Sequence, residues 1–92
     1  MYIQAAKLTF LVVHSFSLKD KRQVSRSLIN KMRHKFNAAV AEVDTQDAHQ
    51  TLTIGVAVVS GDAAHARQSI EEIIRYAAEH ADAELTAVEH CT

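Results

Sequence analysis

The period at which apolar residues recur changes several times along this chain, and the order of those changes limits the folds it can adopt. Alternation of apolar with other residues is typical of a strand that is buried on one face. It is found at residues 2–13, 38–44, 51–60 and 85–89. The three-to-four-residue spacing of an amphipathic helix is found at residues 18–36 and 66–77. With right-handed crossovers, this order predicts an α+β fold, a ferredoxin-like βαββαβ sandwich whose two helices cover one face of a four-stranded antiparallel sheet.

Polar residues mark where both helices are expected to begin. Ser17 stands three residues before Asp20, the spacing of a capping box. Ser60, Gly61 and Asp62 form a turn signal, and the Asp62 side chain is suited to cap the second helix.

Length and composition predict one soluble domain over residues 1–92. No apolar run reaches the roughly 18 residues that span a bilayer, so we expect no membrane partner. The chain has one cysteine, Cys91, which excludes an internal disulfide and a zinc site built from cysteine pairs. We therefore expect a protein of the reducing cytoplasm, without a metal or other cofactor.

Charge is divided unevenly between the two parts of the chain. Residues 1–36 hold eight basic residues and one acidic residue, a net charge of +7, whereas residues 37–92 hold two basic and ten acidic residues, a net charge of −8. On a helix, four of the basic side chains would lie within about 60° of one another, on the side away from the core. With Lys21, whose stem is expected to pack while its ammonium reaches solvent, they form the nucleic-acid-binding candidates: Lys19, Lys21, Arg22, Arg26 and Arg33. The alternative is a solvated face, partly neutralised by acidic residues of the second helix, Glu71, Glu72 and Glu79.

Small side chains dominate the sheet face that is predicted to point away from the helices. The residues expected there are Ala39, Ala41, Val43, Thr53, Gly55, Ala57, Val59, Thr86 and Val88. An apolar sheet face that stays exposed usually marks an interface. The alternative function is therefore a homo-oligomeric module that binds a protein or a ligand through this face.

A loose polar cluster is expected around the hairpin between the second and third strands. Glu42 and Asp44 alternate onto one face, Asp47 follows in the loop, and His65 lies in the first turn of the second helix. Carboxylates with a histidine can bind a divalent metal or share a proton. The spacing is not diagnostic, however, and no nucleophile with its base is evident, so we expect Asp47 to structure the loop and the protein not to be an enzyme.

Three segments in one register resemble the YlxP-like proteins, a bacterial family of unknown function. They are SLKDKR at residues 17–22, AEVDTQD at residues 41–47, and GVAVVS at residues 55–60 followed by Asp62 and His65. The resemblance implies a small ferredoxin-like cytoplasmic protein with no established activity, substrate or catalytic residue. Because such proteins are often encoded near translation-factor and ribosome-maturation genes, ribosomal RNA or a ribosomal subunit is the expected partner.

The chain departs from that family pattern at three places. Asp20 stands where Glu is usual, and Gly61 stands where Asn is expected. Residues 13–16 lack the Pro-Gly-like turn of the family, so the approach to the first helix is expected to differ.

Overall fold

The computed structural model describes residues 1–92, and its elements follow the predicted order. They are β1 (Tyr2–Leu11), α1 (Leu18–Lys35), β2 (Ala39–Glu42), β3 (Thr51–Ser60), α2 (Ala63–His80) and β4 (Glu84–His90). The strands form one antiparallel sheet in the order β2-β3-β1-β4. The predicted ferredoxin-like topology is therefore confirmed.

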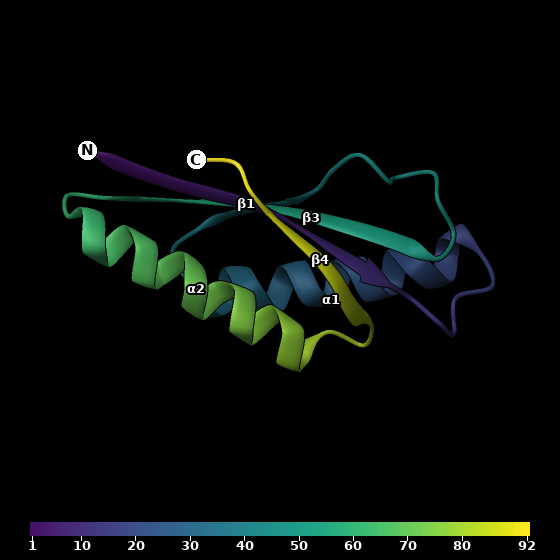
Figure 1. Cartoon of the computed structure of the whole chain (residues 1–92). Helices are drawn as coiled ribbons and strands as arrows, with labels where there is room; N and C mark the ends of the chain where they lie inside the picture. Colours follow the sequence, from purple (N-terminus) through teal and green to yellow (C-terminus); the bar gives the residue numbers. More distant parts are fainter.

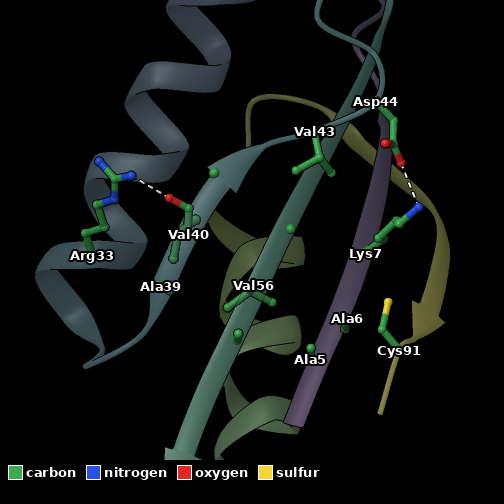
Figure 2. Close-up of a pocket in the computed structure, with 13 residues that line it drawn as sticks. Ala5, Ala6, Lys7, Arg33, Ala39, Val40, Val43, Asp44, Val56 and Cys91 are labelled. Atoms are coloured by element: carbon green, nitrogen blue, oxygen red, sulfur yellow. Dashed lines mark hydrogen bonds and ion pairs between the residues drawn. The ribbon is translucent and has the colours of Figure 1, made fainter. Parts of the chain in front are cut away.

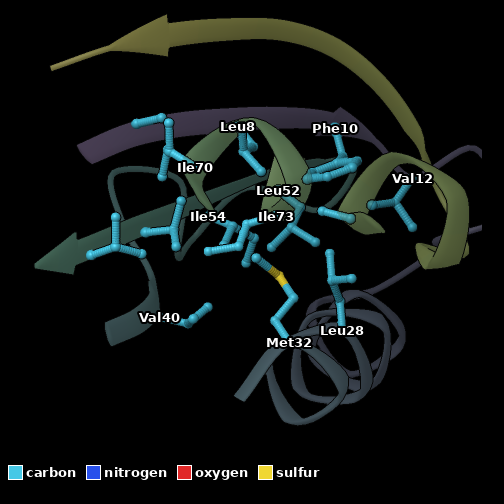
Figure 3. Packing of buried hydrophobic residues seen from close by; sticks show 14 residues of the cluster. Leu8, Phe10, Val12, Leu28, Met32, Val40, Leu52, Ile54, Ile70 and Ile73 are labelled. Carbon is cyan, nitrogen blue, oxygen red and sulfur yellow. The ribbon is translucent and has the colours of Figure 1, made fainter. Parts of the chain in front are cut away.

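Both helices lie against the same face of the sheet, and the opposite face carries no covering element (Figure 1). The core fills the space between the sheet and the helices (Figure 3). Its largest apolar members are Leu8, Phe10, Leu28, Met32, Leu52, Ile54, Ile70 and Ile73. The alternating strand residues and the helical stripes meet here, as their periodicity predicts. Neither helix combines the length and the apolar character needed to cross a bilayer.

Both predicted helix caps are present. The Ser17 hydroxyl accepts a hydrogen bond from the Asp20 amide at 3.2 Å, and the Asp20 carboxylate accepts one from the Phe16 amide at 3.1 Å. At the second helix, the Asp62 carboxylate accepts a hydrogen bond from the His65 amide at 3.0 Å. These contacts satisfy amides that have no partner within the helix.

The open face is lined by small residues, as expected, because the register aligns small side chains across three strands. Ala57 pairs with both Ala5 and Ala39, and Gly55 pairs with both Lys7 and Ala41. The face is therefore shallow over β2, β3 and the first half of β1.

Two residues expected to be exposed on that face are placed differently. Thr53 is buried, and Val43 and Thr45 lie beside it beyond the end of β2: its carbonyl accepts a hydrogen bond from the Val43 amide at 2.9 Å, and its amide donates one to the Thr45 hydroxyl at 2.8 Å. In β4, a register shift opposite Phe10 reverses the alternation. Val88 therefore pairs with Leu8, whose side chain faces the helices, and Glu89 takes a place on the open face.

Candidate functional site

Four basic side chains form an exposed line along α1, here called the basic ridge. Its members are Lys19, Arg22, Arg26 and Arg33. No member takes part in an ion pair, because the three ion pairs of the structure involve only Lys7 and Lys21. The acidic residues of α2 therefore do not neutralise the ridge through direct contact.

A groove of about 320 Å³ runs between the basic ridge and β2, the edge strand next to α1. Arg22, Arg26 and Arg33 line its α1 side, whereas Ala41 and Glu42 line its β2 side. At 1.5 Å of rise per residue, Arg22 and Arg33 are roughly 16 Å apart along the helix axis. The Arg33 guanidinium also donates a hydrogen bond to the Val40 carbonyl on the edge of β2. Three guanidinium groups thus lie along one groove.

Lys21 does not belong to this ridge, and the prediction that its ammonium reaches solvent is wrong. The residue is fully buried. Its Nζ donates hydrogen bonds to the carbonyl oxygens of Thr45, at 2.5 Å, and Gln46, at 3.2 Å. The same atom lies 2.9 Å from Glu42 Oε2. The β2–β3 loop has folded over the first turns of α1 and supplied these partners, so Lys21 is not available to a nucleic acid.

The cage around Lys21 is completed from the helix side. The Ser25 hydroxyl donates a hydrogen bond to Glu42 Oε1 at 3.1 Å, whereas the buried Oε2 accepts no hydrogen bond and is held by the charge of Lys21 alone. A buried charge is tolerated only when it is paired and hydrogen-bonded, and this arrangement meets both conditions for Lys21 and Glu42. The cage joins segments 17–22 and 41–47, and it gives these two motifs a structural role.

The expected polar cluster of the hairpin is dispersed. Glu42 faces α1, whereas Asp44 has a φ of 63°, in the left-handed region, and its carboxylate lies on the open face, 2.7 Å from Lys7 Nζ. The prediction that these two carboxylates share a face is therefore wrong, because the left-handed residue breaks the alternation of the strand. Asp47 is exposed in the loop.

His65 lies far from that loop. Its Nδ1 is 3.1 Å from the Ser60 hydroxyl, at the end of β3. The loop with Asp47 lies at the other end of β3, roughly 30 Å away at the usual rise per residue (Figure 1). The structure does not bring His65 and Asp47 together, and it contains no group of three side chains placed to hold a metal ion.

The open face carries a second hollow, a shallow groove of about 550 Å³ (Figure 2). Its floor consists mostly of small residues: Ala5, Ala39, Ala41, Gly55 and Ala57. Val43 is a larger apolar residue of the lining. Arg33 and the Lys7–Asp44 ion pair lie at the rim of the groove. The hydrogen bond with Asp44 and the charge of that carboxylate raise the pKa of Lys7. The groove is thus apolar at its floor and charged at its rim.

Sequence reasoning missed the pairing of Lys21 with Glu42, although a signal was present. Glu42 stands two residues after Val40, a core residue of the same strand. Side chains two residues apart in a strand point to the same face, so Glu42 is expected to face the helices. Lys21 lies on the core stripe of its helix. Opposite charges at two inward positions indicate a buried pair.

Comparison with known proteins agrees with this description. A de novo designed protein with a ferredoxin fold, solved by solution NMR, superimposes with a TM-score of 0.59 at 15% identity, covering 100% of this chain and 87% of the designed one. This likeness concerns the fold alone. An uncharacterised protein of Bacillus subtilis (strain 168), YlxP, is 25% identical over 71 residues, which are 77% of each chain. The family described as "Protein of unknown function (DUF503)" matches residues 3–90, and the chain therefore belongs to this YlxP-like family.

Proposed function

We propose that this protein is a non-enzymatic RNA-binding module, associated with ribosomal RNA or a ribosomal subunit, that contacts phosphates through the basic ridge. The observation that carries the proposal is the absence of any ion pair to Lys19, Arg22, Arg26 or Arg33. Exposed cations without an ion pair attract an external polyanion more strongly than paired ones do. When such cations neutralise several phosphates, counterions are released from the RNA, and this release favours binding.

The chemistry of the ridge suits phosphodiesters. Three of its four members are arginines, whose planar guanidinium groups bind phosphate oxygens in pairs. The line from Arg22 to Arg33 is long enough to follow several successive phosphates, and the exposed Asn30 adds a polar side chain in the groove below. Recognition would therefore rest mainly on the RNA backbone.

Base stacking on the sheet does not contribute to this proposal. Sheet-based RNA readers display aromatic side chains on the open face, whereas the residues facing outward here are aliphatic, small or charged. One exposed aromatic, Phe16, stands two residues before α1, with 84% of its surface accessible. A single base stacked there would add to the phosphate contacts.

The test measures binding of fluorescently labelled single-stranded RNA and co-sedimentation with ribosomal subunits, each at several salt concentrations. The variant Arg22→Glu/Arg26→Glu removes the two ridge arginines that make no internal hydrogen bond. The matched control is Arg67→Glu/Arg75→Glu, which makes the same charge change at exposed positions of α2.

With about four phosphate contacts, the logarithm of the affinity should fall with the logarithm of salt concentration with a slope near −3. The ridge variant should lose binding and reduce that slope, whereas the α2 variant should bind more like the parent protein. Binding that is independent of salt, or an equal loss in both variants, would contradict the proposal.

A further inference from the structure

Both edges of the sheet carry features that disfavour pairing with another strand. On β2, Arg33 Nη2 donates a hydrogen bond to the Val40 carbonyl at 2.5 Å, and Gln46 Nε2 donates one to the Glu42 carbonyl at 3.4 Å. On β4, the register shift opposite Phe10 interrupts the regular ladder. Blocked carbonyls and bulges are devices that keep edge strands from adding to other sheets. Association through a sheet edge is therefore disfavoured.

The open face has no such protection. Ile3 and Val59 pair with each other on this face and remain 50% and 63% exposed. Next to them lies the groove of about 550 Å³, whose floor is made of alanines and a glycine. Large aliphatic side chains and a shallow apolar floor thus lie side by side on a face that no element of the chain covers (Figure 1), and the ion-paired Lys7, Asp44 and Glu89 border them toward β4.

We propose that the occupant of this face is a second copy of the chain, giving a two-fold symmetric dimer with four layers, helices outside and two sheets stacked inside. At about 3.3 Å per residue and 4.8 Å between strands, the strands present roughly 500 Å² per copy. The total of about 1,000 Å² is near the lower limit for a specific interface. The small side chains allow the two sheets to approach closely, and the area predicts a weak, concentration-dependent dimer.

Charge selects one of the two possible directions for the two-fold axis. Stacked sheets keep their strands nearly aligned, so the axis runs either along the strands or across them. Pairing places Val40, Val56, Ala6 and His90 in one row across the sheet. Arg33 lies at the β2 end of this row, and Glu89, whose carboxylate also lies 3.9 Å from Lys7 Nζ of its own copy, lies next to the β4 end.

An axis along the strands brings β2 of one copy over β4 of the other, with Arg33 close to Glu89 of the second copy. An axis across the strands brings β2 over β2 and places the two Arg33 side chains near each other, which is unfavourable. In the proposed dimer, two Arg33–Glu89 pairs therefore lie on either side of the apolar residues of the open face.

Sedimentation velocity over about 1 to 500 μM tests the dimer, with circular dichroism to check folding. The variant Ala57→Arg places a long cation on the open face, and Ala78→Arg places the same side chain on the exposed side of α2 as a control. We expect a dimer at the upper concentrations for the parent and for Ala78→Arg, and a monomer for folded Ala57→Arg. A monomeric parent protein, or a dimer that persists in Ala57→Arg, would overturn the proposal.

Charge exchange tests the direction of the axis without altering the floor of the groove. Glu89→Arg should weaken the dimer about tenfold or more, and adding Arg33→Glu to it should restore most of the loss. Failure of the second substitution to restore the dimer would overturn the proposed arrangement. Because Ala57 is outside the basic ridge, a monomeric Ala57→Arg that still binds RNA separates this proposal from the proposed function.

Discussion

Replacing Lys21 with Met isolates the energetic role of the buried cage. The substitution keeps an unbranched apolar stem of similar length and removes the ammonium group. It leaves Glu42, whose side chain is only 15% exposed, without its cation, and it leaves the carbonyl groups of Thr45 and Gln46 without this donor. Breaking a buried ion pair from one side costs about 3–5 kcal/mol. That is a large part of the roughly 5–14 kcal/mol by which a domain of this size is stable.

Urea unfolding followed by far-ultraviolet circular dichroism measures this loss as a change in the free energy of unfolding. The control is Arg22→Met, the adjacent position on the same helix, where an exposed side chain is replaced and a change within about 0.5 kcal/mol is expected. The double variant Lys21→Met/Glu42→Leu removes both charges. Because it leaves no unpaired buried charge, it should be more stable than Lys21→Met alone.

Two results would refute this reasoning. A loss below about 1 kcal/mol in Lys21→Met would mean that the ammonium is not needed to hold the β2–β3 loop against α1. A double variant whose loss equals the sum of the two single losses would mean that Lys21 and Glu42 are energetically independent.

Three further predictions concern the open face, the cap of α1 and the turn before α2. Because Asp44 raises the pKa of Lys7 above its usual 10.5, the contribution of this pair to stability is complete below about pH 10 and is lost as the pH rises through the raised pKa. An NMR titration of Lys7 should show a lower pKa in Asp44→Asn, and an unchanged pKa would rule out Asp44 as the cause. Ser17→Ala should lower the free energy of unfolding by about 1 kcal/mol, since it removes the cap of α1; no loss in urea unfolding would show that the cap is dispensable. Gly61→Ala should raise the free energy of unfolding by about 0.4–1 kcal/mol, because the added Cβ meets nothing within 4 Å and the φ of Gly61 is not positive. A loss of stability in Gly61→Ala would show that the turn needs glycine.

The order of the elements and the two helix caps follow from the sequence because their causes are local. Alternation and helical spacing report which side of an element is apolar, and this information lies within ten to twenty consecutive residues. Ser17 and Asp62 cap helices through amides three residues away, a contact that the sequence spacing already fixes. The position of the basic ridge on α1 follows from the same helical geometry.

The surroundings of individual charged side chains were decided by the tertiary structure. The helical pattern placed Lys21 on the core side, but the acceptors for its ammonium come from residues 24 and 25 positions away. The left-handed backbone at Asp44 depends on how the loop closes, and it sends that carboxylate to the opposite face from Glu42. A pattern in the sequence reports only the side on which a charge emerges, whereas its partner is set by contacts between distant segments. For the same reason, only the structure decided that the four cations of the basic ridge remain without a carboxylate and that one face of the sheet remains uncovered.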